Sequence, residues 1–282
     1  MSNKLIIDSG STKTEWVILR DSKIIHKIET QGFNPYYFNS DVLKLILLND
    51  VIPSLDSIPI DDIYYYGTGC STNQNKSIVH NALQQIFRTS NIYIEHDLFG
   101  AAIALLKDQA GIACILGTGT NSCVYDGKQI THNIPSLGYL LADEGSGTDL
   151  GKLVVSAYLK HELPTKLHEA FKALYPKNES ALLKEIYSHD QPNTLLSSFS
   201  YFINDHIDHP SIKALVIQSF DSFFTTYILK YPNYKELPIR FTGSIAFQYQ
   251  DILKESASKF GLAVDLILKN PMDGLIDFHQ SK

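Results

Sequence analysis

Two short segments rich in glycine and hydroxyl side chains are the residues of this chain best suited to hold an anion. Asp8-Ser9-Gly10-Ser11-Thr12-Lys13-Thr14 follows the apolar residues 5–7, and Gly117-Thr118-Gly119-Thr120-Asn121-Ser122 follows the apolar residues 112–116. Backbone N–H groups in such turns approach a phosphate closely because few bulky side chains intervene. Only the first turn carries a carboxylate, Asp8. The pair therefore predicts two hairpin bends that hold one polyphosphate, an arrangement for phosphoryl transfer.

The residue types of the first turn suggest separate roles. Asp8 can face a Mg²⁺ shell, Gly10 and Ser11 can present amide N–H groups, and Thr12 can bond a phosphate oxygen. Lys13 either contacts a phosphate or lies on the solvent face. An ordinary polar turn is the alternative for the whole segment.

The second turn offers Gly117, Thr118 and Gly119 for phosphate contact, although this is also a common loop composition. It lacks the full Gly-x-Gly-x-x-Gly pattern of dinucleotide-binding folds. No segment of the chain matches Gly-x-x-x-x-Gly-Lys-Ser/Thr either. The sequence thus excludes Walker-type and Rossmann sites.

Asp97 is the candidate general base. It stands between a strand-like stretch, residues 92–95, and a helix of small apolar residues, 98–106, where α/β proteins place ligands. A carboxylate there can act as a general base if it lies within hydrogen-bond distance of a substrate hydroxyl. The alternative is that Asp97 only caps the helix. Because neighbours on a strand point to opposite faces, we expect His96 to be structural.

Two further polar segments are candidates for sugar contacts. Asp143-Glu144-Gly145-Ser146-Gly147 precedes a predicted helix, so its carboxylates either bond sugar hydroxyls or cap the helix dipole. Asn34, in Gly32-Phe33-Asn34-Pro35, reads either as a turn residue or as a sugar contact. The residue types leave both choices open.

Composition narrows the class of protein. The 282 residues carry a net charge of −6 with 24 dispersed Lys and Arg, which argues against a nucleic-acid partner. Cys70, Cys114 and Cys123 lack the close spacing of a zinc or redox motif. No apolar run is long enough for a signal peptide or a membrane span. We expect a cytoplasmic protein with no membrane partner.

The elements that must position these residues follow from hydrophobic periodicity. The patterns predict strands at 5–8, 14–19, 23–29, 63–66, 92–95, 112–116, 122–125, 239–242 and 263–268. They predict helices at 41–48, 75–87, 98–106, 145–160, 164–174, 179–187, 194–205, 211–230 and 245–259, with a final helix after Pro271. Two lobes meet near residues 108–111, which gives an N-terminal lobe 1–110 and a C-terminal lobe 111–282.

The order of these motifs resembles the N-acetylglucosamine kinase family, within the BadF/BadG/BcrA/BcrD ATPase-like branch of the sugar kinase, Hsp70 and actin superfamily. The resemblance spans nearly the whole chain. The family's first phosphate motif is similar to residues 8–14, its Gly-x-x-Asn sugar segment to 32–34, its catalytic aspartate to Asp97 and its second phosphate motif to 117–122. Its Gly-Asp-Glu-Gly-Ser segment resembles Ala142-Asp143-Glu144-Gly145-Ser146, and its adenosine motif resembles Gly243-Ser244-Ile245-Ala246.

The resemblance implies an α/β, two-lobed, actin-like ATPase fold of the ribonuclease H-like type. Each lobe would be a mixed sheet flanked by helices, with ATP and substrate in the cleft between lobes, and the final helix would pack back on the N-terminal lobe. It further implies ATP phosphates near Thr12 and Thr118, adenosine near Gly243 and Ser244, and Mg²⁺ held by Asp8 through water. The implied sugar contacts are Asn34, Thr120, Asn121, Ser136, Leu137, Gly138, Tyr139, Leu140 and Asp143.

The implied activity is ATP-dependent phosphorylation of the 6-hydroxyl of N-acetylglucosamine or a related sugar by a homodimer, with Asp97 as base. This chain departs from the family at Ser9 and Ser11, where glycines are frequent, and at Ala142. Residues 134–137 also lack a glycine-rich stretch seen in some members. Two alternatives remain: an ATPase activator with an iron–sulfur cluster, and a sugar sensor without turnover.

Overall fold

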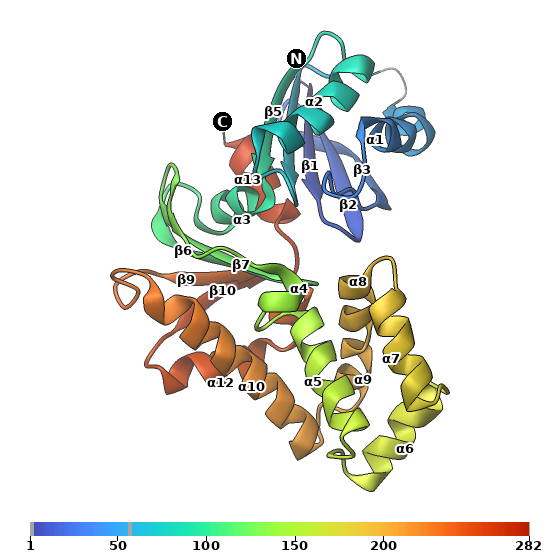
Figure 1. The fold of residues 1–282 in the computed structure, drawn as a ribbon. Helices are drawn as coiled ribbons and strands as arrows, with labels where there is room; N and C mark the ends of the chain where they lie inside the picture. Colours follow the sequence, from blue (N-terminus) through green and yellow to red (C-terminus); the bar gives the residue numbers. More distant parts are fainter. Residues whose placement is uncertain (1–2, 56–57, 282) are drawn as a thin grey trace. The chain divides into compact units, whose positions relative to one another are not determined.

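The computed structural model describes residues 3–55 and 58–281, and its chain divides into two compact units. The first unit contains Met1–Gln109, Tyr125–Ile130 and Asn270–Lys282. The second contains Ala110–Val124 and Thr131–Lys269. Figure 1 labels the elements of both. Each unit is built on one five-stranded sheet flanked by helices, so the predicted α/β fold is confirmed.

The sheet of the first unit has the strand order β3-β2-β1-β4-β5. Strands β1 and β2 form an antiparallel hairpin that β3 extends, whereas β4 and β5 run parallel to β1. The carboxyl ends of β1, β4 and β5 therefore share one edge. The strands are β1 (Asn3–Ser9), β2 (Lys13–Arg20), β3 (Lys23–Gln31), β4 (Asp62–Gly67) and β5 (Asn91–His96).

Helices cover both faces of this sheet (Figure 1). On one face, α1 and α2 pack on the alternate β1 residues Leu5 and Ile7 in one apolar core. On the other face, α3 and the C-terminal α13 contact each other and β1. The helices of the unit are α1 (Ser40–Ile46), η1 (Leu47–Val51), η2 (Ile52–Leu55), α2 (Asn73–Ile86), α3 (Asp97–Leu106) and α13 (Met272–Gln280).

The last helix is joined to the first strands although it lies at the other end of the sequence. Lys4 Nζ donates to the carbonyl of His279 at 2.9 Å, and His279 Nε2 lies 2.9 Å from the Tyr66 hydroxyl. His279 is buried and its ring packs on that of Tyr64. These contacts explain why residues 270–282 belong to the first unit.

The sheet of the second unit has the order β10-β9-β6-β7-β8, with β9 parallel to both β6 and β10. Its strands are β6 (Ala110–Leu116), β7 (Thr120–Asp126), β8 (Ile130–Asn133), β9 (Ile239–Thr242) and β10 (Val264–Leu268). Between β8 and β9 the chain is helical, as predicted. Phenylalanines from three of these helices and from β9, among them Phe171, Phe202, Phe223 and Phe241, fill its core.

Three of the helices predicted for the second unit are interrupted. Single helices were expected at 194–205, 211–230 and 245–259, but each is broken at a buried aromatic residue, namely Phe199, Tyr227 and Tyr249. Burying these rings outweighs the local helical preference. The helices are α4 (Gly138–Leu141), α5 (Gly147–Leu159), α6 (Thr165–Leu174), α7 (Glu179–Ser188), α8 (Pro192–Ser198), α9 (Ser200–Asp205), α10 (Pro210–Thr226), η3 (Ile228–Lys230), α11 (Ser244–Gln248) and α12 (Gln250–Lys259).

Both glycine segments are hairpin bends, as predicted, but the turns are shorter than expected. Lys13 and Thr14 pair with β3, and Thr120 and Asn121 already belong to β7. Cross-strand hydrogen bonds thus extend the strands into residues whose composition is typical of turns. Neither the helix α4 nor the strand β8 was among the predicted elements, although Asp126-Gly127, just before β8, is a hairpin signal. None of the helices in the described part of the chain is long and apolar enough to cross a membrane.

Candidate active-site residues

The backbone of the first turn, Gly10–Thr12, is hydrogen-bonded to the segment that follows β3. Gly32 N donates to the Thr12 carbonyl at 3.0 Å, and Phe33 N donates to the Gly10 carbonyl at 3.2 Å. A Cβ on Gly32 would lie only 2.4 Å from the Ser11 carbonyl carbon, so this close approach requires glycine. Among the described residues, no hydrogen bond is donated by the N–H of Ser11 or Thr12. The turn therefore has two amide donors for an anion.

The two serines that depart from the family pattern have structural partners. Ser9 is fully buried, where its hydroxyl lies 2.9 Å from Thr14 Oγ1 and donates to the Phe33 carbonyl at 3.2 Å. Ser11 Oγ accepts a hydrogen bond from Asn34 Nδ2 at 3.2 Å. Both hydroxyls thus tie the first hairpin to the segment that carries Asn34.

Asn34 is placed beside the first turn by hydrogen bonds at both ends of its amide. Its Oδ1 accepts from Tyr36 N at 3.0 Å while Nδ2 bonds Ser11. A Cβ on Gly69, in the loop after β4, would lie 2.5 Å from that Oδ1. The structure therefore brings this predicted sugar contact together with the first phosphate turn.

Lys13 was predicted either to contact a phosphate or to lie on the solvent face, and its side chain pairs with two glutamates. Its Nζ lies 2.6 Å from Glu15 Oε1 and 3.1 Å from Glu29 Oε2, on an exposed part of β2 and β3. Two carboxylates therefore already balance its charge.

Asp8 and Asp97 lie near each other at the carboxyl edge of the first sheet. Asp8 pairs with Tyr66 of β4, which pairs with Glu95 of β5, two residues before Asp97. Burial, and then the negative charges of Asp97 and Glu15, raise the pKa of Asp8 to about 7, against a smaller opposing effect of Lys13. None of the described residues donates a hydrogen bond to the Asp8 carboxylate. The edge thus carries more negative charge than the protein balances.

The expectation that His96 and Asp97 point apart is wrong. His96 ends β5 and caps α3, and Asp97 is the first residue of that helix, so strand alternation does not extend across the pair. His96 Nδ1 lies 3.0 Å from Asp97 Oδ1. Leu98 N donates to the same oxygen at 2.7 Å. The candidate base is therefore held by Leu98 N, and the His96 ring, whose Nδ1 also accepts from Leu98 N at 3.3 Å, lies beside it.

In the second unit, the turn Gly117–Gly119 is bound by the first residues of α5. Gly147 N donates to the Gly117 carbonyl at 2.8 Å, and Thr148 donates to the Thr118 carbonyl from its N–H at 3.1 Å and from its hydroxyl at 2.6 Å. The capping pair Ser146 and Asp149 starts this helix, with Ser146 Oγ accepting from Asp149 N at 3.1 Å. The sequence analysis did not predict the contact of Gly147 and Thr148 with the turn. The signal available for it was the pair Ser146 and Asp149, which is typical of a helix start.

Gly243 is packed against the same turn. It has φ +119°, and a Cβ there would lie 2.2 Å from the Leu116 carbonyl oxygen and 3.1 Å from Gly117 N. Ser244 then begins α11, whose Phe247 N donates to the Gly243 carbonyl at 3.0 Å. The structure thus joins the second phosphate turn to the predicted adenosine motif.

Asp143 is the centre of a second polar group, composed of predicted sugar contacts. It is buried, and its Oδ1 accepts from Thr120 N and from Ser136 Oγ, each at 3.3 Å. A Cβ on Gly119 would lie 3.3 Å from its Oδ2. Burial raises the pKa of Asp143, although both hydrogen bonds oppose the shift. Asp143 therefore lies directly beside the second turn.

Thr120 and Asn121 are both engaged within the protein. The Thr120 hydroxyl donates to the Glu144 carbonyl at 2.7 Å. Asn121 Oδ1 accepts from Ser122 N at 3.0 Å and from Asn133 Nδ2 at 3.1 Å. The amide nitrogen of Asn121 is the group that these contacts leave for a ligand.

The remaining predicted sugar contacts, Leu137 to Leu140, form the start of α4. Leu137 and Leu140 are 59% and 78% exposed. Sequence reasoning missed Lys152, which donates from Nζ to the carbonyls of Tyr139 at 3.1 Å and Ala142 at 2.9 Å. This lysine ties both ends of α4 to α5, and no local sequence pattern would reveal it.

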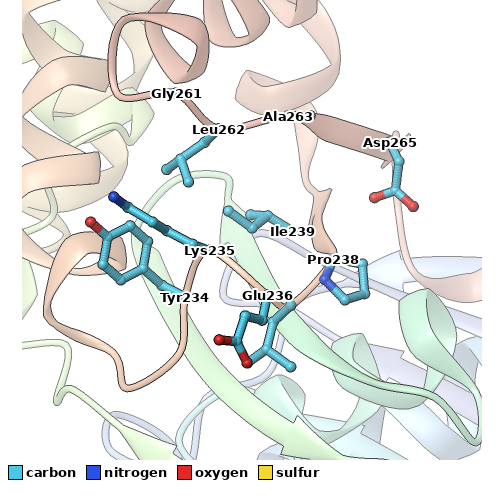
Figure 2. Close-up of a pocket in the computed structure, with 10 residues that line it drawn as sticks. Tyr234, Lys235, Glu236, Pro238, Ile239, Gly261, Leu262, Ala263 and Asp265 are labelled. Carbon is cyan, nitrogen blue, oxygen red and sulfur yellow. The ribbon is translucent and has the colours of Figure 1, made fainter.

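The second unit also has a surface cavity of about 390 Å³ at the amino ends of β9 and β10 (Figure 2). Gly243 follows the opposite end of β9, so this cavity is separate from the second turn. None of the predicted site residues lines it. Its lining residues are Tyr234, Lys235, Glu236, Leu237, Pro238, Ile239, Gly261, Leu262, Ala263 and Asp265.

No protein-family model and no curated protein matches the chain. Among solved structures, a "putative N-acetylglucosamine kinase" from Porphyromonas gingivalis is 39% identical, with a TM-score of 0.94 over 100% of this chain and 99% of that one. A second, from Chromobacterium violaceum, is 16% identical with a TM-score of 0.78, covering 99% of both chains. A ROK family glucokinase from Streptomyces griseus, solved with glucose and AMPPNP, is 11% identical with a TM-score of 0.62, covering 98% of both. The last two show the fold alone.

Proposed function

Because the chain belongs to the N-acetylglucosamine kinase family, we propose that it is an ATP-dependent kinase that phosphorylates the 6-hydroxyl of N-acetylglucosamine or a related amino sugar or hexose. The observation that carries the proposal is the 39% identity to a relative matched over its full length. The arrangement of polar groups within each unit supports it.

In each unit, the glycine turn offers donors for the phosphate groups of ATP. In the first unit, the N–H groups of Ser11 and Thr12 are the available donors, with the Thr12 hydroxyl beside them. In the second unit, Gly117–Gly119 would contact phosphate, and Gly243 and Ser244 would lie next to the nucleoside. Backbone donors suit this task because they are fixed before the substrate arrives and need no rearrangement as charge moves during transfer.

Asp97 would accept the proton of the attacking sugar hydroxyl. That hydroxyl is a weak acid, so a nearby carboxylate helps by taking the proton as the new P–O bond forms and the bond to the ADP oxygen breaks. Leu98 N donates a hydrogen bond to Asp97 Oδ1, which restrains the carboxylate. Orientation of this kind is where most of the advantage of an enzymatic base arises.

We propose that Asp8, at the carboxyl edge of the first sheet, faces a divalent cation, in a part of the described chain where no group of three or more His, Cys, Asp or Glu side chains surrounds a metal position. Asp8 has a raised pKa because burial and nearby carboxylates disfavour its charge, and Lys13, the cation nearest to it in the hairpin, is paired with two glutamates. When bound there with ATP, Mg²⁺ would supply positive charge to the phosphate oxygens. Asp8 would hold it directly or through water.

The group around Asp143 would recognise the sugar. A buried carboxylate that accepts hydrogen bonds from sugar hydroxyls confers specificity because a ligand that lacks those hydroxyls leaves it unpaired. Asp143 retains acceptor capacity at Oδ2, since the hydrogen bonds from Thr120 and Ser136 go to Oδ1. We propose that Asn34, Asn121 and the start of α4 complete the contacts.

A coupled assay of ADP release tests this function. N-acetylglucosamine, glucosamine, N-acetylmuramic acid, N-acetylmannosamine and glucose would each be supplied with Mg-ATP. We expect sugar-dependent ADP release with at least one of them, and a product whose 6-hydroxyl carries the phosphate. Asp97→Asn should still bind ATP and sugar but lose at least about 100-fold in kcat, the low end of what a positioned base contributes.

The outcomes also separate the alternative functions. Sugar binding measured by calorimetry without ADP release would support a sensor. Iron in the purified protein, with no sugar-dependent turnover, would support the ATPase activator. Near wild-type turnover by Asp97→Asn would exclude Asp97 as the base while leaving a kinase.

A further inference from the structure

The side chains of Asn121 on β7 and Asn133 on β8 are joined by a hydrogen bond between these two neighbouring strands. Asn133 Nδ2 donates to Asn121 Oδ1 at 3.1 Å. The same nitrogen donates to the Ser122 carbonyl at 2.7 Å and to the Ile134 carbonyl at 3.3 Å. Because a carbonyl oxygen only accepts, two backbone groups determine that the nitrogen of the Asn133 amide, and not its oxygen, faces Asn121.

A backbone group determines the orientation of the Asn121 amide in the same way. Its Oδ1 accepts from Ser122 N at 3.0 Å, and an N–H group only donates. Oδ1 thus receives two donors, Ser122 N and Asn133 Nδ2. None of the hydrogen bonds in the described part of the chain uses Asn121 Nδ2. Asn121, which is half-buried, is therefore a hydrogen-bond donor toward a ligand.

We propose that Asn133 is a positioning residue for Asn121, an inference that rests on the proposed kinase function. Asn133 holds Oδ1 against the protein, so Asn121 offers the hydrogens of Nδ2 to an acceptor oxygen of the sugar. Thr120, the residue before Asn121, donates from its N–H to Asp143, whose Oδ2 is an acceptor. The proposed sugar site thus combines a fixed donor with a fixed acceptor.

This role predicts an effect on sugar binding. An amide that is free to rotate would turn its oxygen toward the sugar part of the time, and an acceptor that faces an acceptor forms no hydrogen bond. The hydrogen bonds of both side chains end on residues 121–134, in the second unit. Loss of Asn133 should therefore raise the KM for sugar and leave kcat and the KM for ATP nearly unchanged.

Three variants test this role by steady-state kinetics and by calorimetry of sugar binding. Asn133→Ala should raise the KM for sugar about threefold to tenfold, the range for one net hydrogen bond. Asn121→Asp keeps an oxygen for both protein donors but replaces Nδ2, so its KM for sugar should rise at least about tenfold. In the double variant, loss of Asn133 should add less than about twofold, because the donor that Asn133 positions is already absent.

Thr131→Ala is the matched control. Thr131 Oγ1 donates to the Val124 carbonyl at 3.3 Å, so it also joins a side chain of β8 to the backbone of β7. Like Asn133 it is exposed, and its hydroxyl does not bond Asn121. Its loss should leave the KM for sugar unchanged.

The results separate the inference from the proposed function. A wild type that releases no ADP in response to sugar overturns the proposed function, and the inference with it. An active wild type with an unchanged KM for sugar in Asn133→Ala overturns the inference alone. So does a full Asn133→Ala effect in the Asn121→Asp background, or an equal effect in Thr131→Ala, because a general loosening of β8 gives both. If Asn133→Ala fails to fold, Asn133→Asp, which keeps the shape but donates no hydrogen bond, replaces it.

Discussion

Substitution of Gly243 by alanine tests whether the proposed adenosine motif lies against the second glycine turn. Gly243 has φ +119° and ψ 155°, a region that only glycine occupies readily. A Cβ there would lie 2.2 Å from the Leu116 carbonyl oxygen and 2.6 Å from its carbon, so backbone atoms would have to move. Leu116 directly precedes the turn. The alanine variant should therefore disturb both stability and nucleotide binding.

The expected size follows from two contributions. Backbone strain in this region costs about 1–3 kcal/mol, and overpacking of a close contact costs about 1–3 kcal/mol more. We expect Gly243→Ala to lose about 2–6 kcal/mol of unfolding free energy in the second unit, by the sum of these two ranges. The KM for ATP should rise about tenfold, because a shift of Gly117 misplaces phosphate donors, a loss comparable to one net hydrogen bond.

Gly261 supplies the matched control. It also has a left-handed backbone, φ +70°, but a Cβ there meets no atom within 4 Å. Gly261→Ala should cost only about 1–2 kcal/mol and leave the KM for ATP unchanged. Urea unfolding followed by circular dichroism, with steady-state kinetics, measures both. Equal losses in the two variants, or an unchanged KM in Gly243→Ala, would refute the close contact.

Three further predictions follow from single side chains. Lys13→Ala should change the KM for ATP less than about threefold and stability by less than about 1 kcal/mol, because exposed ion pairs contribute little; a tenfold rise in KM in the same kinetic assay would make Lys13 a phosphate ligand. Lys152→Met should raise the KM for sugar about fivefold to tenfold, since loss of a charged donor to the carbonyls of Tyr139 and Ala142 frees α4; an unchanged KM would exclude α4 from the sugar site. Burial raises the pKa of Asp149 above 3.8, despite the opposing hydrogen bond from Ser219, so its ionisation destabilises the fold as pH rises through the raised value. The Tm of Asp149→Asn should therefore fall less than the Tm of the wild type as the pH rises from 4 to neutrality. Parallel curves of Tm against pH for the two proteins would contradict the raised pKa of Asp149.

Local composition was sufficient to find the two hairpin bends and the position of Asp97. Gly10 and Gly117 follow β-branched and apolar runs, and small residues follow Asp97, so turn and helix preferences act within a few residues of each site. The same information predicted an α/β fold with a late strand ending in Gly243. It misplaced the ends of the strands because those ends depend on pairing with another strand, as when Lys13 pairs with Gln31.

The amino-acid sequence by itself determined which residues can carry charge, hydrogen bonds and tight turns, and in what order they occur. Tertiary structure decided which of them meet. Lys152 reaches carbonyls 10 and 13 residues back, Gly243 reaches a turn more than a hundred residues earlier, and Lys13 turns to glutamates on two strands. His96 meets Asp97 only because the strand ends between them. Such contacts follow from strand order and helix packing, which local preferences leave undetermined.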